Sequence, residues 1–296
     1  MTCFHPIAAW RSPAGVVFHS GGRTFDRFDL PCGQCSGCRA KRARDWSLRC
    51  MHEASLWPEN CFVTLTYGRN ALPPDSSLEY RDFQLFMKRL RKFFFPRLVR
   101  FFCCGEYGPL NLRPHFHACL FNCSFSDSVV RGKSGAGAVF FRSPTLDDLW
   151  SFGSCSVQPL TIGTAAYCAK YIVGKVTGDA AESHYSRVDE DGVIHRRVPE
   201  FAHMSLRPGI GAGWLERFRG DVFPHDFVVA DGVKFSPPKF YDRLLKRSDE
   251  CVRLDVAGAR QARAKLSFAD NSDERLRVRE EVHKARVRNQ RRVFDG

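Results

Sequence analysis

Hydrophobic and polar positions along the chain predict a mixed α+β protein. Residues 60–67 (NCFVTLTY), 97–108 and 114–123 are rich in β-branched and aromatic side chains, which is typical of buried strands. Residues 38–57 and 78–95 instead repeat apolar side chains at helical spacing. The short connection between the second and third strands predicts an antiparallel hairpin.

Weaker patterns extend this outline. Residues 124–145 are expected to form a loop that encloses a short strand, VFF. Thr145 is expected to cap a short helix, and Thr164 to cap a helix over GTAAYCAKYIVGK. Two turn-rich pieces and a charged, helix-prone tail from about residue 257 follow. We therefore expect an antiparallel sheet of about five strands with flanking helices. The chain is expected to divide into a basic, Cys-containing N-terminal extension, a core and a C-terminal region: residues 1–57, 58–178 and 179–296.

Composition narrows the class of protein. The 45 basic and 32 acidic residues leave a net charge of +13, which favours a polyanionic partner such as nucleic acid, although a solvated basic face would account for the charge alone. No apolar run reaches the ~18–20 residues of a membrane span, and the first residues do not resemble a secretory signal. We expect a cytoplasmic protein with reduced thiols, and the cysteines in apolar contexts are expected in the core: Cys61, Cys103, Cys104, Cys119, Cys123 and Cys168.

Two histidines form the first candidate site. On a strand, His115 and His117 point to the same face, while Phe116 points into the core. Glu106 is expected to lie beside them on the partner strand of the hairpin. One carboxylate and two imidazoles suit a three-ligand metal site that stays open to substrate. The alternative is a pair of surface histidines beside an exposed acid.

Two tyrosines form the second candidate site. Tyr167 and Tyr171 share one face of the helix predicted around them. A phenol is a weak nucleophile near pH ~7, because its pKa is ~10, so a cation must stabilise the charge that develops as it reacts. Lys170 and Lys175 are candidates to contribute. The alternative is two half-buried tyrosines without a catalytic role.

Three cysteines ahead of the first long helix have the spacing of a structural zinc site. They are Cys32, Cys35 and Cys38. Cys3, His5 and Cys50 are candidates for a fourth ligand, and we favour Cys3, because a ligand there would fix the start of the chain. The alternatives are buried thiols in a tight turn and, with less support, a redox pair, since no thioredoxin-like βαβ unit follows.

Two basic runs are candidates for DNA contact. They are Arg39, Lys41, Arg42 and Arg44, and Lys88, Arg89, Arg91 and Lys92. Residues 88–100 contain no acid, and phenylalanines lie among the basic residues. Single-stranded DNA binding combines phosphate neutralisation with base stacking. We assign the basic side chains to DNA and Phe93, Phe94 and Phe95 to packing.

Three segments together resemble the motifs of the HUH endonucleases. They are FVTLTY, GEYG with RPHFHACLF, and AAYCAKYIVGK, in this order. The paired tyrosines resemble those of the two-tyrosine replication initiators. PCGQCSGCRAKRARDW, CMHEAS and RPGIGAGW add a resemblance to the replication initiators of the Microviridae, small single-stranded DNA phages, and especially to the gokushovirus branch. The resemblance covers roughly residues 1–250 and is strongest over 30–175.

The resemblance implies a rolling-circle replication initiator that acts in the cytoplasm of a bacterial host. Mg or Mn on His115, His117 and Glu106 would polarise the scissile phosphate of single-stranded origin DNA. One tyrosine would form a 5′-phosphotyrosine and free a 3′-OH for the polymerase, and the second would allow the displaced strand to be rejoined. The sequence has no ATPase loop of GxxxxGK[ST] type, so a host helicase would unwind the DNA. Lys175 departs slightly from the family pattern, in which the lysine lies one position closer.

Two other functions fit the same residues. One is a non-catalytic, zinc-stabilised nucleic-acid-binding protein in which the histidines are structural. The other is a metal-dependent hydrolase that uses water, with the tyrosines as bystanders.

Overall fold

The computed structural model describes residues 3–21, 24–108, 112–133, 137–174, 180–188 and 191–295. The chain divides into two compact units. Unit 1 comprises Met1–Arg42 and Leu254–Gly296, and unit 2 comprises Ala43–Arg253. Helices α1 (Ser36–Ala54) and α8 (Glu250–Leu266) each belong to both units.

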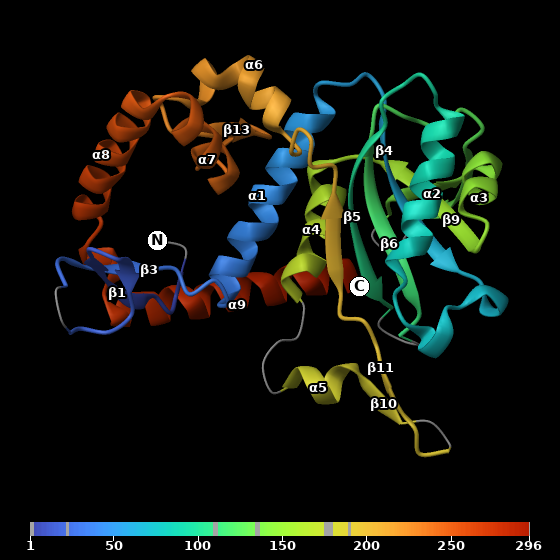
Figure 1. The fold of residues 1–296 in the computed structure, drawn as a ribbon, viewed down its shortest axis with the longest axis horizontal. Coiled ribbons are helices and arrows are strands. Elements are labelled where there is room, and N and C mark those ends of the chain that lie inside the picture. Colours follow the sequence, from blue (N-terminus) through green and yellow to red (C-terminus); the bar gives the residue numbers. More distant parts are fainter. Residues whose placement is uncertain are drawn as a thin grey trace. The chain divides into compact units, whose positions relative to one another are not determined.

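A seven-stranded antiparallel sheet forms the centre of unit 2 (Figure 1). Its order is β12-β5-β6-β4-β9-β8-β7. The bounds are β4 Asn60–Tyr67, β5 Arg100–Tyr107, β6 Pro114–Phe121, β7 Val129–Lys133, β8 Val139–Arg142, β9 Gly153–Pro159 and β12 Phe201–Met204. The α+β class and the β5–β6 hairpin are confirmed.

The sheet is larger than the expected five strands. β7 lies in the segment expected to be a loop, and β12 comes from the C-terminal region to pair with β5. β7 is an edge strand of mostly exposed residues with a register shift between Val130 and Gly132. An exposed edge strand does not need alternating apolar positions, so the sequence pattern could not reveal it.

Two layers of helices cover the two faces of this sheet (Figure 1). We call the first the aromatic face: α2 (Tyr80–Phe93) and α3 (Pro144–Trp150) bury Phe83, Phe86 and Trp150 against Phe116. We call the second the site face: α4 (Ile162–Gly174) and residues 43–54 of α1 pack there on smaller side chains. The buried residues of the site face include Cys50, Cys104, Cys119, Ala165, Cys168 and Ala169. The six cysteines expected in the core are all buried.

Two helices begin earlier than the sequence suggested. The cap of α3 is Ser143, whose side chain accepts a hydrogen bond from the Leu146 amide, with Pro144 as the first helical residue. Thr161 Oγ1 accepts from the Thr164 amide at the start of α4. Thr145 and Thr164 are therefore not the caps, because the residue that precedes the first helical turn is the one placed to accept these bonds.

The C-terminal part of unit 2 is more helical than its turn-rich sequence suggested. It contains α5 (Ala180–Tyr185), α6 (Ala212–Val222) and α7 (Lys239–Ser248). Short strand pairs accompany them: β10 Ser186–Val188 with β11 Ile194–Arg196, and β13 Val228–Ala230 with β14 Val233–Phe235.

A buried charge pair fixes this part to the sheet. Arg100 Nε on β5 donates to Glu53 Oε1 on α1 over 2.6 Å, and both side chains are nearly fully buried. Glu53 Oε2 accepts from the Gly211 amide at 2.8 Å, and Arg100 donates to the Pro208 carbonyl at 2.7 Å. The segments CMHEAS and RPGIGAGW therefore meet in one hydrogen-bonded network. Removing either charge from such a pair costs about 3–5 kcal/mol, because the other stays buried without its partner.

Unit 1 combines a small sheet with two helices. β1 (Ile7–Ser12) lies between β2 (Gly15–Val17) and β3 (Arg27–Leu30). The helical tail is confirmed as the end of α8 and as α9 (Asp273–Asp295), joined by a short 3-10 turn, Ala269–Asn271. None of the helices in the described part of the chain combines the length and the apolar composition that a membrane crossing requires.

Candidate metal site and nucleophile helix

Glu106, His115 and His117 meet on the site face of the β5–β6 hairpin. The strand register places Glu106 opposite His115 and Cys104 opposite His117. His115 Nε2 lies 2.6 Å and His117 Nε2 lies 2.7 Å from the same oxygen, Glu106 Oε1. The sequence predicted this convergence, and the alternation of the strand sends Phe116, which is fully buried, to the aromatic face.

The Nδ1 atoms of both histidines are held from behind. His117 Nδ1 lies 2.9 Å from Thr64 Oγ1 of the neighbouring strand β4. His115 Nδ1 donates to the Arg113 carbonyl oxygen at 3.1 Å, since a carbonyl only accepts. A neutral His115 therefore directs the lone pair of Nε2 toward a carboxylate oxygen. A cation between these acceptors would stabilise this arrangement.

The Glu106 carboxylate is buried and only half satisfied. Its side chain is 3% exposed, and in the described part of the chain Oε2 has no hydrogen-bond partner. Burial alone would raise the pKa of Glu106, but the hydrogen bonds from His115 and His117 outweigh it and lower that pKa below its usual value. Burial lowers the pKa of His117, against the opposing effect of Glu106. One buried carboxylate and two oriented imidazoles form a donor set that fits a divalent cation.

The nucleophile helix α4 lies beside this group. Tyr167 is 43% exposed, and its ring packs edge-on against His117, with 5.0 Å between the ring centroids. On the opposite side of α4, Cys168 Sγ contacts the His117 carbonyl oxygen at 3.6 Å and Cys104 Sγ at 3.5 Å. Small buried side chains thus let α4 approach the strands closely and place Tyr167 at the histidines.

The other residues predicted for this helix are placed only in part. Tyr171 continues α4 one turn beyond Tyr167, and its side chain lies outside the described residues. Lys170 is exposed on α4. Lys175 lies outside the described residues. The roles predicted for these three residues stay predictions.

The basic residues of α2 lie on the other side of the sheet. Lys88, Arg91 and Lys92 are exposed on the helix that covers the aromatic face, away from Glu106 and the histidines. Arg89 donates to the carbonyl oxygens of Leu149 and Trp150 at 2.7 and 3.1 Å, and so caps the end of α3. A DNA strand on α2 would therefore not be the segment at the candidate site.

The phenylalanines at the end of α2 depart from the expectation that they pack. Phe94 packs against the aromatic core, but Phe93 and Phe95 are 57% and 82% exposed. α2 ends at Phe93, so the residues that follow are no longer held on its buried face.

The basic residues of α1 lie in both units. Arg39, Lys41 and Arg42 belong to unit 1 and Arg44 to unit 2, where its guanidinium lies over the Phe235 ring at 5.4 Å. Their predicted contact with DNA stays a prediction.

The four predicted cysteine ligands come together in unit 1, with Cys3 in the fourth position. The other two candidates for that position lie elsewhere. His5 Nε2 is 3.0 Å from Glu280 Oε2, and Cys50 is buried in the core under the site face.

Thr64 and the Arg113 carbonyl are the site groups that sequence reasoning missed. Thr64 lies in the FVTLTY segment at an alternate position of β4, on the same face as His117. That alternation was the only signal available, because the pairing of β4 with β6 and the backbone turn at Arg113 appear only in the folded chain.

Comparison with known proteins identifies relatives over most of the chain. A family model for replication-associated proteins of the ORF2 type matches residues 60–176. The chain is 31% identical over 273 residues to replication-associated protein ORF2 of Spiroplasma virus 4, which covers 83% of this chain and 81% of that protein. It is 29% identical over 260 residues to replication-associated protein VP4 of Bdellovibrio phage phiMH2K, which covers 84% of this chain and 78% of that protein. No solved structure matches.

Proposed function

The chain belongs to the family of phage replication-associated proteins, and we propose that it initiates rolling-circle replication by nicking single-stranded origin DNA through a tyrosine. The observation that carries the proposal is the placement of Tyr167 on α4 beside His117, within the group formed with Glu106 and His115. Family membership supports the replication role. The site geometry supports the chemistry.

Glu106, His115 and His117 would hold one Mg or Mn ion. Thr64 and the Arg113 carbonyl keep both imidazoles turned with Nε2 toward the carboxylate, so the ligand atoms are oriented before an ion binds. When bound, the ion supplies positive charge that polarises the phosphoryl oxygens and stabilises the departing oxygen. The sheet register holds these side chains, so little reorganisation accompanies the reaction.

The covalent step is a transesterification. The Tyr167 oxygen attacks the scissile phosphorus, a bond forms between them, and the bond from phosphorus to the 3′ oxygen breaks. The phenol loses one proton and the departing 3′ oxygen gains one, so the products are a 5′-phosphotyrosine and a free 3′-OH. No oxidant or second substrate is needed, and the energy of the phosphodiester is kept in the tyrosine linkage for rejoining.

Tyr171 provides a second nucleophile four residues along the same helix. After one round of synthesis it attacks the regenerated origin, and the 3′-OH released then attacks the first phosphotyrosine. Lys170 and Lys175 are proposed to stabilise the phenolate that each attack requires. The free 3′-OH serves a host polymerase, and a host helicase separates the strands.

A labelled-DNA assay tests the proposal. Oligonucleotides that tile the genome encoding this chain carry a label at the 3′ end, because that end stays with the 5′-phosphotyrosine. The full chain with Mn²⁺ is expected to become labelled on a denaturing gel. Tyr167→Phe and Tyr171→Phe together should abolish the label, and chelation should do the same.

Tyr80→Phe is the matched control, because Tyr80 lies on α2 at the aromatic face and should leave labelling unchanged. A label that survives the double replacement contradicts the tyrosine mechanism. Cleavage without label would instead support a hydrolase that uses water. Binding without cleavage would support a non-catalytic DNA-binding protein.

A further inference from the structure

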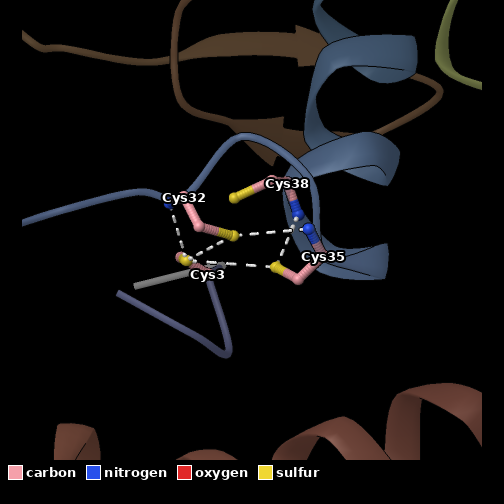
Figure 2. Close-up of side chains that lie close together, drawn as sticks. All are labelled: Cys3, Cys32, Cys35 and Cys38. Carbon is pink, nitrogen blue, oxygen red and sulfur yellow. Dashed lines mark hydrogen bonds between the residues drawn. The ribbon is translucent and has the colours of Figure 1, made fainter. Parts of the chain in front are cut away.

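Four cysteines from three segments of unit 1 converge at the start of α1 (Figure 2). Cys3 precedes β1, Cys32 follows β3, Cys35 precedes α1, and Cys38 lies in its first turn. Their four Sγ atoms all lie within 4.8 Å of one another. Cys3 is separated from Cys32 by 29 positions, so the cluster depends on the fold and not on local spacing alone.

The sulfur separations fit a shared metal ion and do not fit a disulfide. Cys3 Sγ lies 3.6 Å from Cys32 Sγ and 3.9 Å from Cys35 Sγ. A tetrahedral zinc ion with bonds of ~2.3 Å to sulfur requires sulfur atoms about 3.8 Å apart. A disulfide requires about 2.05 Å, and all four thiols are free.

Backbone amides point at the sulfur atoms, as a site for thiolates requires. The amides of Phe4 and Cys38 donate to Cys35 Sγ at 3.4 and 3.5 Å. The Cys32 amide donates to Cys3 Sγ at 3.2 Å, and the Cys35 amide to Cys32 Sγ at 3.3 Å. Hydrogen bonds of this kind stabilise negative charge on sulfur and fix the direction of each ligand.

Unit 1 has little else to hold it together. Its buried apolar residues, in the part that the structure describes, are Cys3, Phe4, Ala9, Cys38, Val256 and Leu276. Two of these are members of the cluster. Such a small apolar core stabilises a fold weakly, and small domains of this kind commonly depend on a disulfide or a metal ion.

We propose that Cys3, Cys32, Cys35 and Cys38 bind one zinc ion that ties the chain start to α1. Four thiolates close the coordination sphere, so the ion has a structural role and no position open for substrate. The free energy of metal binding then contributes to the folding of unit 1. This site is separate from Glu106 and the histidines, and it does not depend on the nicking activity.

Metal content tests the proposal directly. The purified full chain is expected to carry one tightly held zinc ion, measured by mass spectrometry of the metal. Cys35→Ser should remove it, whereas Cys251→Ser, at an exposed cysteine in α8, should leave it in place. Counting zinc in His117→Ala as well separates this ion from any zinc bound at the histidines, and that variant should keep one ion.

Cobalt substitution and a ligand exchange keep the test informative if Cys35→Ser folds poorly. Cobalt in place of zinc should give the thiolate charge-transfer absorption and the intense visible bands of a tetrahedral site. Cys38→His should retain metal, because imidazole can replace one thiolate, whereas Cys38→Ser should lose it. Absence of zinc from the wild-type chain, retention of zinc in Cys35→Ser, or a disulfide among these four cysteines would overturn the proposal.

Discussion

The aromatic face and the site face of the central sheet are built from the same strands but serve different purposes. On β6, Phe116 is fully buried against α2 and α3, while His115 and His117 on either side of it meet Glu106 on the opposite face. Because side chains alternate along a strand, residues adjacent in sequence contribute separately to stability and to chemistry. A shift of one residue in register would exchange the two sets.

The helices that cover the two faces differ in the same way. α2 and α3 bury large aromatic rings, which fill a thick apolar layer. α4 presents Ala165, Cys168 and Ala169, so it can lie close to the strands and hold Tyr167 at 5.0 Å from the His117 ring. Large side chains stabilise one face, and small ones allow precise placement of a reactive group on the other.

The largest expected effect is a loss of stability on the aromatic face. Phe116→Ala removes a fully buried ring from the core and should lower the free energy of unfolding by about 3–5 kcal/mol. Urea unfolding measures this loss, with Phe93→Ala as control, since Phe93 is 57% exposed and should change stability by less than about 0.5 kcal/mol. The separation of the faces fails if Phe116→Ala abolishes DNA labelling in protein that is still folded.

The next effect concerns activity and belongs to the site face. His117→Ala removes one proposed ligand and should slow labelling of the protein by roughly a hundredfold to a thousandfold, equivalent to about 3–4 kcal/mol in the barrier. Unfolding should change by much less than in Phe116→Ala. His203→Ala is the control, because β12 places His203 against Tyr80 on the aromatic face of the same sheet. Equal activity in His117→Ala and the wild-type chain would contradict the assignment.

Acid sensitivity should come from the α1 side of unit 2. Burial against Trp214 and Tyr241 lowers the pKa of His52 from 6.5 to about 4. Between these values the unfolded chain takes up a proton and the folded chain does not, so stability falls as the pH falls from 6.5 to about 4. The loss should be about 3 kcal/mol.

Unfolding at several pH values in His52→Phe and the wild-type chain isolates this contribution. The variant should show a shallower decline over that range. Identical slopes in the two proteins would show that His52 is not responsible.

The smallest effect should follow from a group that holds a ligand without contacting the ion. Thr64→Val removes the hydroxyl at 2.9 Å from His117 Nδ1 and should weaken metal affinity or activity by roughly 10–100-fold. Thr66→Val is the matched control: Thr66 lies opposite His115, whose Nδ1 is held by the Arg113 carbonyl. Titration of labelling against Mn²⁺ concentration measures both variants. Equal losses in the two would mean that the Thr64 hydroxyl has no special role.

The sequence predicted the parts of this fold that depend on local pattern. Strand β4 was predicted with its observed bounds, and the hairpin that brings Glu106 to His115 followed from a short turn between two apolar strands. Both depend on residues close in sequence. The position of Cys3 as the fourth cysteine was also predicted, although its basis was only the benefit of fixing the chain start.

The parts that were missed depend on contacts between distant segments. β12 joins the sheet because β5 offers an edge, and its own sequence carries little strand pattern. Glu53 and Arg100 form a buried pair across 47 positions, and the Gly211 amide joins them from the C-terminal region. Charged residues in a helix and a strand are usually exposed, so only the folded chain shows that these are internal.

The most direct test of the central claim is to map the tyrosine that carries the DNA. Protein labelled in Mn²⁺ is digested with protease, and the peptide that retains the nucleotide is sequenced by mass spectrometry. The chain has seven tyrosines, and we expect the DNA on Tyr167 or Tyr171 and on no other. DNA attached to a tyrosine outside α4, or cleavage that leaves every tyrosine unmodified, would contradict the account.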